Sequence, residues 1–279
     1  MAFGYQADYF NCTKVRLGTP WPRILEGMVS DHVDQVDSHL QWTTGNYKVL
    51  TDSYTEFCIV AQEFIAELGS VNADEYPPAW SDAADKLSRI RGISSPMEWP
   101  AETINTEHPR SQYKSKCFLK EALKKNAQLI EMGEKALLIE EVLAMRLYTG
   151  PLFEKYNAVN RGGSLVGETP TFMANRFIEL CKGNRYCATN LVLASAIIKN
   201  SKLTKAIVEY RGISSSRLPK WFWKADSTTG VRGGVEFAFM STTADRAVAF
   251  QYANNGGAGT IFEIKMGMID NGDDLTWIS

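Results

Sequence analysis

The sequence predicts an α+β protein, with helices first and short strands only in the last third of the chain. Apolar residues recur every three or four positions through residues 20–70 and 113–200, which is typical of helices that bury one face. Short runs rich in β-branched and aromatic residues occur only after residue 205. The apolar content of 44% is ordinary for a globular protein with a sizeable core.

Residues 1–110 are expected to form a helical region of unknown role. Apolar periodicity predicts helices over residues 21–41 and 46–69, and Gly69 is the expected end of the second. A short helix should run from about Ser81 to Ile90. His32 and His39 lie seven positions apart, a spacing that does not suit ligands on one helix face, so we expect no metal site. Residues 92–111 hold three prolines and are the best linker candidate.

Residues 113–279 are expected to form a second domain that begins with further helices. The pattern predicts one long helix to residue 147 with a bend at Gly133, and a helix that starts at Pro151 and includes Arg161. Thr169 and Pro170 should open the next helix, which should stop near Gly183. A nearly continuous apolar block then predicts a deeply buried helix over residues 186–200.

Four strands are predicted, over residues 206–211, 236–240, 260–266 and 274–278. The first ends in Arg211 and Gly212, and the second stops at Ser241 and Thr242. An arginine fork donates two hydrogen bonds at once and therefore suits a phosphate. Taken singly, such an arginine is more often a surface charge, and Ser-Thr-Thr is an ordinary helix N-cap.

Together, the arginine strand and the aromatic-flanked Ser-Thr-Thr resemble the first two parts of the R-S-E signature of mono-ADP-ribosyltransferases. Tyr148-Thr149 and the stretch from Tyr156 through Asn157 to Arg161 and Gly162 resemble the helix that precedes the arginine strand in the bacterial-toxin-like branch. Residues 260–266 resemble a later strand of the same fold. The resemblance covers roughly residues 130–279.

The resemblance implies a mixed α/β ADP-ribosyltransferase fold that binds NAD as a substrate. ADP-ribose would pass from NAD to a protein side chain, often arginine, and nicotinamide would be released. The implied catalytic residues are Arg211, which would hold the pyrophosphate, and Ser241, which would contact the nicotinamide side and position the catalytic carboxylate. The implied cofactor-binding residues are Tyr148, Asn157, Arg161, Arg211, Gly212, Ser241, Thr242 and Phe250.

The last element of the signature, a Glu-x-Glu, does not occur between Ser241 and Ser279. We therefore expect a chain truncated before that element, with weak NAD binding and negligible transfer. Ala238 is a second departure, because family members often carry a polar residue three positions before the serine. Two alternatives stay open: an NAD glycohydrolase, and a non-catalytic NAD-pocket module that binds a partner.

Composition limits the partners. The chain has 30 basic and 32 acidic residues, and the resulting net charge of −2 gives no global attraction to nucleic acid or to an anionic membrane. No apolar stretch is long enough to span a bilayer.

Five scattered cysteines indicate reduced thiols and a cytoplasmic protein. Aromatic and basic residues alternate over residues 218–224, which is compatible with single-stranded nucleic acid, but we favour core packing plus a loop. NAD and an acceptor protein are the expected partners, with no nucleic acid and no membrane.

Overall fold

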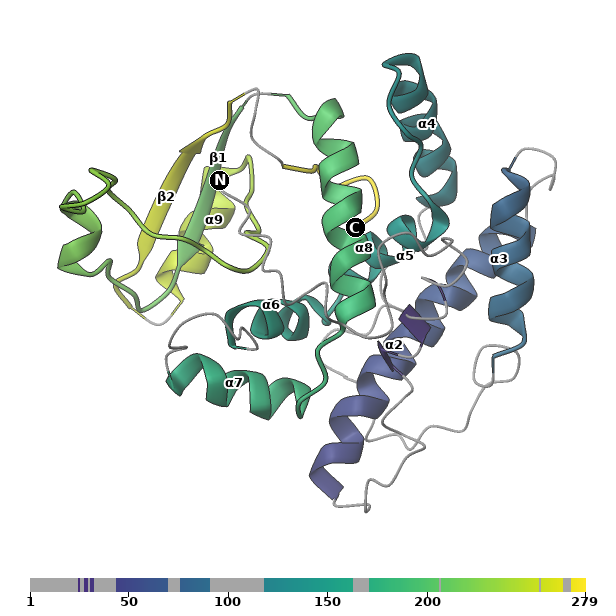
Figure 1. Ribbon diagram of the computed structural model, residues 1–279, viewed down its shortest axis with the longest axis horizontal. Coiled ribbons are helices and arrows are strands. Elements are labelled where there is room, and N and C mark those ends of the chain that lie inside the picture. Colours follow the sequence, from purple (N-terminus) through teal and green to yellow (C-terminus); the bar gives the residue numbers. More distant parts are fainter. Residues whose placement is uncertain are drawn as a thin grey trace. The chain divides into compact units, whose positions relative to one another are not determined.

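The protein is α+β, as predicted, and its described residues form helices and, near the end of the chain, one small antiparallel sheet (Figure 1). The computed structural model describes residues 25, 28, 29, 31, 32, 44–69, 76–90, 118–162, 171–205, 207–255, 257–267 and 272–279. The chain divides into two compact units. The helical unit comprises the described residues up to Leu203 together with 272–279, and the sheet unit comprises those from Thr204 to Gly267. The predicted domain boundary at residues 110–113 lies outside the described residues.

The first described helices of the helical unit are α2 (Thr44–Gly69) and α3 (Pro78–Ser88). Helix α2 confirms the helix predicted over residues 46–69 and ends at Gly69. Helix α3 begins before the predicted Ser81, because a proline suits the first turn, where a backbone N–H has no helical partner. Of the helix predicted over residues 21–41, the few described positions are helical, and the rest, His39 included, lie outside the described residues.

The single helix predicted up to residue 147 is wrong, because Gly133 ends one helix instead of bending it. Helix α4 (Phe118–Glu131) stops there, and α5 (Ile139–Tyr148) starts after a non-helical stretch. Gly133 has a φ of 76°, in the left-handed region that favours glycine. Its N–H donates to the Ile130 carbonyl at 2.9 Å, and the Glu134 N–H donates to the Leu129 carbonyl at 2.8 Å. This pair of bonds is the Schellman termination of a helix.

Three further helices complete the helical unit: α6 (Phe153–Gly162), α7 (Thr171–Cys181) and α8 (Cys187–Asn200), with the short 3₁₀ turn η5 (Ser201–Leu203) after α8. Helix α6 starts two residues after Pro151, which lies in a turn, so the predicted first residue is wrong. Gly183, with a φ of 89°, follows the end of α7 as expected. Helix α8 buries Val192, Leu193 and Ala196 and packs on α5.

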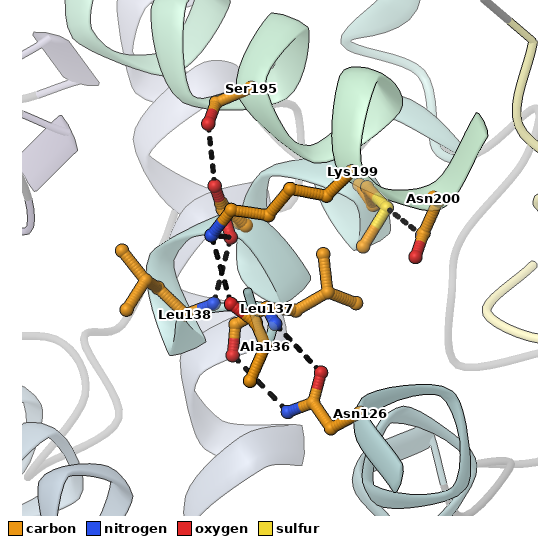
Figure 2. A network of polar contacts seen from close by, with 9 residues as sticks. Asn126, Ala136, Leu137, Leu138, Ser195, Lys199 and Asn200 are labelled. Atoms are coloured by element: carbon orange, nitrogen blue, oxygen red, sulfur yellow. Dashed lines mark hydrogen bonds and ion pairs between the residues drawn. The ribbon is translucent and has the colours of Figure 1, made fainter. Parts of the chain in front are cut away.

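A buried carboxylate joins α5 to α8 (Figure 2). Glu141 is fully buried, and its two oxygens accept hydrogen bonds from Ser195 Oγ and Lys199 Nζ, both at 2.7 Å. Glu141 also accepts from the Leu138 N–H at 2.8 Å, which caps the first turn of α5. Lys199 Nζ donates in addition to the Ala136 carbonyl at 2.9 Å. The ion pair therefore fixes the start of α5 against one face of α8.

The strand predicted over residues 274–278 is wrong, because these residues form a turn within the helical unit. The Ile278 N–H donates to the Leu275 carbonyl at 3.1 Å, and the Ile278 side chain is fully buried. Arg146, a buried residue of α5, donates from Nη1 to the Ile278 carbonyl at 2.8 Å. Asn200 Nδ2 donates to Asp273 Oδ2 at 3.0 Å. Because a buried guanidinium requires acceptors, it holds this segment against the helices.

The sheet unit contains two antiparallel strands, β1 (Val208–Ile213) and β2 (Thr260–Lys265), and the helix α9 (Arg246–Asn254), which packs on β1 (Figure 1). The strand predicted over residues 260–266 is confirmed, and the first strand lies slightly later than predicted. A Cβ placed on Gly212 would lie 1.9 Å from the Ala249 carbonyl oxygen, so only glycine allows α9 this close. The predicted strand over residues 236–240 is wrong, because that segment forms no ladder.

No helix among the described residues combines the length and the apolar character needed to cross a bilayer. The same part of the chain holds no disulfide, and burial raises the pKa of both Cys58 and Cys181 to about 12. These two thiols are therefore protonated and inert at neutral pH.

Candidate functional site

Strand β1 delivers Arg211 to the face of the sheet opposite α9. Neighbouring residues of a strand point to opposite faces, and Gly212 is the residue in close contact with α9. Arg211 lies opposite Phe262 of β2. Its Nη1 donates to the backbone carbonyl of Ser241 at 2.8 Å, and its side chain is 19% exposed. The structure therefore brings together the arginine and the serine that resemble the first two parts of the R-S-E signature, although Ser241 follows no strand.

The segment after Ser241 is fixed to β1 by backbone and side-chain bonds. Tyr210 and Thr243 exchange N–H to carbonyl hydrogen bonds of 2.8 and 2.9 Å. Thr242 Oγ1 donates to the carboxylate of Glu209, which lies two residues before Arg211 on the same face of β1. The N-cap of α9 is Asp245, which accepts from the Ala247 N–H at 2.8 Å, so the interpretation of Ser-Thr-Thr as the cap is wrong.

Glu236 lies beside the guanidinium. Its Oε2 is 4.0 Å from Arg211 Nη2, while its Oε1 accepts from the Ala238 N–H at 3.0 Å. The site thus combines a fixed, partly accessible cation, a nearby carboxylate and the exposed Ser241. Such a cation can bind a phosphate oxygen with a charge-assisted hydrogen bond, and an incoming anion must compete with Glu236 for it.

The other predicted ligands divide between the two units. Gly212, Thr242 and Phe250 belong to the sheet unit with Arg211, and Phe250 on α9 is 58% exposed. The close packing of α9 explains by itself why residue 212 is a glycine, without any contact to NAD. The role in NAD binding that the resemblance implies for Phe250 stays a prediction.

Tyr148, Asn157 and Arg161 belong to the helical unit. Asn157 is buried on α6 and donates from Nδ2 to the Tyr148 hydroxyl at 3.3 Å. Arg161 is half-buried in the last turn of α6. Asn157 is therefore not part of an exposed polar face. The role in NAD binding that the resemblance implies for Asn157 stays a prediction.

A polar cluster in the helical unit corresponds to no sequence motif. Lys155 Nζ lies 2.6 Å from Ser53 Oγ, which in turn is 2.8 Å from the Tyr186 hydroxyl. A lysine in contact with a serine is one way to activate a nucleophile. Ser53 and Tyr186 are both buried, however, and burial raises the pKa of Tyr186. We assign the cluster a structural role, since it joins α2, α6 and the start of α8.

His32 lies next to this cluster and packs against the rings of Phe57 and Tyr186, each with a centroid 5.3 Å away. Burial lowers its pKa to about 3, and the charge of Lys155 contributes, so the imidazole is neutral. Thr189 Oγ1 donates to Asp31 Oδ2 at 3.0 Å and lies 3.4 Å from His32 Nε2. Within the described residues, no group of His, Cys, Asp and Glu could hold a metal ion.

Comparison with known proteins gives no match: no family model, no curated protein and no solved structure matches the chain. The case for a function therefore depends on the chemistry of the residues around Arg211 and on the motifs they carry.

Proposed function

We propose that the sheet unit binds NAD and that the chain is an NAD-dependent protein mono-ADP-ribosyltransferase, with arginine as the first acceptor to test. The observation that supports this most is the hydrogen bond from Arg211 to the Ser241 carbonyl. It joins the two residues that resemble the first two elements of the R-S-E signature, although 30 positions separate them in the chain. No such contact is expected if the arginine were only a solvated charge at a strand end.

Arg211 would bind the pyrophosphate of NAD. The bond to Ser241 holds the guanidinium in one orientation, so less conformational freedom is lost when the phosphate binds. The Glu236 carboxylate lies only 4.0 Å from Arg211. The ion pair lost when the pyrophosphate binds would therefore offset part of the attraction between Arg211 and the pyrophosphate. NAD affinity is therefore expected to be modest, because the pyrophosphate must compete with the Glu236 carboxylate for Arg211.

The transfer step breaks the bond between the ribose C1′ of NAD and the nicotinamide nitrogen. The acceptor nitrogen forms the new bond to C1′ and loses a proton. Because positive charge develops on the ribose, a carboxylate is needed to stabilise it. Ser241 would position that group, but residues 241–279 hold no Glu-x-Glu. Removal of one preorganised electrostatic group typically costs about 10²–10³ in rate, so this chain should bind NAD but transfer ADP-ribose very slowly.

Saturation-transfer NMR with NAD in large excess tests the proposal, because this method detects weak binding. We expect saturation of the adenine and nicotinamide protons, and its loss when unlabelled ADP-ribose competes for the site. A parallel incubation with labelled NAD and polyarginine should label the acceptor barely above the protein-free blank. Absence of any saturation transfer to NAD would contradict the proposal. Nicotinamide release without labelled acceptor would favour the glycohydrolase alternative.

A further inference from the structure

An exposed turn of the sheet unit presents two tryptophans to solvent. This 3₁₀ turn, η6 (Lys220–Trp223), follows Pro219, and its Trp221 and Trp223 are 63% and 64% exposed. Phe222, between them, points inward and meets the ring of Phe262 on β2 edge-on, with centroids 6.4 Å apart. The turn is therefore anchored to the sheet by one ring while the two larger rings are held outward.

A second segment extends the apolar surface. Val231, Val235 and Phe237 are all exposed. Gly234 lies against the turn, because a Cβ on it would be 3.6 Å from the Phe222 ring and 3.7 Å from the Trp221 ring. Five large apolar side chains thus project from two adjacent segments. Such a concentration is uncommon on a monomeric protein surface and marks an interaction site. We call these residues, with the basic ones that flank them, the tryptophan surface.

The flanking charges are mainly positive. Four exposed basic residues accompany the aromatic ones: Arg217, Lys220, Lys224 and Arg232. The same stretch holds two acids, Asp226 and Glu236, so the exposed basic residues outnumber the acids four to two. Asp226 Oδ1 accepts from the Thr228 and Thr229 N–H groups at 3.0 and 2.7 Å, and Glu236 lies beside Arg211. The partner that fits this surface is therefore anionic and has an apolar layer.

We propose that the tryptophan surface docks on an anionic lipid membrane. Tryptophan is enriched at the level of the lipid headgroups, where its ring is buried and its N–H stays hydrated. Lysines beside it are attracted to acidic headgroups. A single-stranded nucleic acid would use the tryptophans and the basic residues, but Val231 and Val235 offer no ring for a base to stack on. A membrane accommodates the aliphatic side chains as well.

The proposal is consistent with the overall charge of −2, because attraction would come from local residues and not from the whole chain. Contact would be peripheral, through side chains of one turn and one neighbouring segment. The tryptophan surface adjoins Arg211, because Phe222 packs on Phe262, the cross-strand neighbour of Arg211. The vesicle test needs no NAD, so it tests membrane binding separately from the proposed function.

Vesicle co-sedimentation of the full chain tests the proposal. Vesicles of phosphatidylcholine with about 30% phosphatidylserine should bind the protein at least about tenfold more tightly than phosphatidylcholine alone. The variant W221A/W223A should bind the acidic vesicles at least about tenfold more weakly. The variant K220E/K224E should lose the preference for phosphatidylserine. High salt should release the wild-type protein, because it screens the basic residues.

Two matched controls alter exposed residues of the helical unit. Phe172→Ala removes an exposed aromatic ring, and Lys135→Glu reverses an exposed charge, so both should leave vesicle binding unchanged. No binding to the acidic vesicles, or unchanged binding of W221A/W223A, would overturn the proposal. Binding of an oligothymidylate that needs Trp221 and Trp223, without vesicle binding, would replace the membrane with single-stranded nucleic acid. Circular dichroism of each variant checks that the fold persists.

Discussion

Arg211 Nη1 donates a 2.8 Å hydrogen bond to the backbone carbonyl of Ser241. Tyr210, the residue before Arg211, is in turn paired with Thr243 through two backbone hydrogen bonds. After a long loop, residues 241–243 therefore lie against β1 and are fixed there by four hydrogen bonds, the fourth being that from Thr242 to Glu209. Any ligand that binds Arg211 must approach this junction.

Glu236 should weaken anion binding at Arg211. Glu236→Gln removes the carboxylate 4.0 Å from Arg211 Nη2 but keeps an acceptor oxygen for the Ala238 N–H. Partly exposed ion pairs contribute at most about 1 kcal/mol, so NAD affinity should rise by about two- to fivefold. Glu263→Gln, an exposed residue of β2, is the control and should leave affinity unchanged. Lower NAD affinity of Glu236→Gln would show that Glu236 assists binding instead of competing with it.

Gly212 should be essential for the packing of α9. In Gly212→Ala, the new methyl group would lie 1.9 Å from the Ala249 carbonyl oxygen, so the helix must move. Such overpacking costs about 1–3 kcal/mol in the free energy of unfolding. Urea denaturation monitored by hydrogen exchange of β1 and α9 measures this loss. Gly234→Ala is the matched control, because its methyl group would only reach ordinary contact distances. Equal stability of the two variants would contradict the packing described.

Lys199 should stabilise the helical unit by neutralising Glu141. Lys199→Met leaves a fully buried carboxylate without its cation, and breaking such a pair typically costs about 3–5 kcal/mol. The midpoint of thermal unfolding should fall, whereas Lys202→Met, at an exposed residue, should have little effect. The double variant E141Q/K199M should recover part of the loss, since the uncompensated charge is gone. Additive losses in the double variant would mean that the two groups do not act as a pair.

Asp273 should make stability depend on pH. Burial raises the pKa of this carboxyl from 3.8 to about 7, although the hydrogen bond from Asn200 and the charge of Lys125 oppose the shift, while Asp274 adds to it. The folded state therefore disfavours ionisation. The contribution of Asp273 to the free energy of unfolding is largest below about pH 4. As the pH rises to about 7, this contribution falls by as much as about 4 kcal/mol.

Asp273→Asn should remove that dependence, because the amide is uncharged at every pH and nearly the same size. The free energy of unfolding, measured from pH 4 to about 8, should fall less steeply in this variant than in the wild type. Asp85→Asn on the exposed face of α3 is the control and should keep the wild-type slope. A slope that Asp273→Asn leaves unchanged would assign the pH dependence to other groups.

The sequence predicted what local patterns determine and missed what distant residues impose. Apolar periodicity located α2 and α8, and the β-branched run located β2. Residues 274–278 have strand-like composition, yet buried Arg146, 132 positions away from Ile278, holds them in a turn. Residues 236–240 pair with no strand in the part of the chain that the structure describes, and strand propensity depends on such a neighbour. Gly133 was ambiguous because glycine is compatible with both a bend and an end of a helix.

The same distinction applies to the candidate site. The proximity of Arg211 and Ser241 followed from motif resemblance, since nothing in the spacing of 30 residues requires it. The ion pair between Glu236 and Arg211 could not be predicted either, because no motif relates the two residues. The contact between Ser53 and Lys155 spans 102 positions, so no local pattern could reveal it.

Titration calorimetry of NAD with Arg211→Lys tests the central proposal most directly. A point charge replaces a planar fork, so NAD binding should weaken by about 1–3 kcal/mol, which is about 5- to 150-fold in Kd. Arg217→Lys, the same change at an exposed loop residue, should leave Kd unchanged. Circular dichroism should show that both variants keep the wild-type fold. If folded Arg211→Lys binds NAD as tightly as the wild type, Arg211 does not hold the pyrophosphate and the proposed function loses its support.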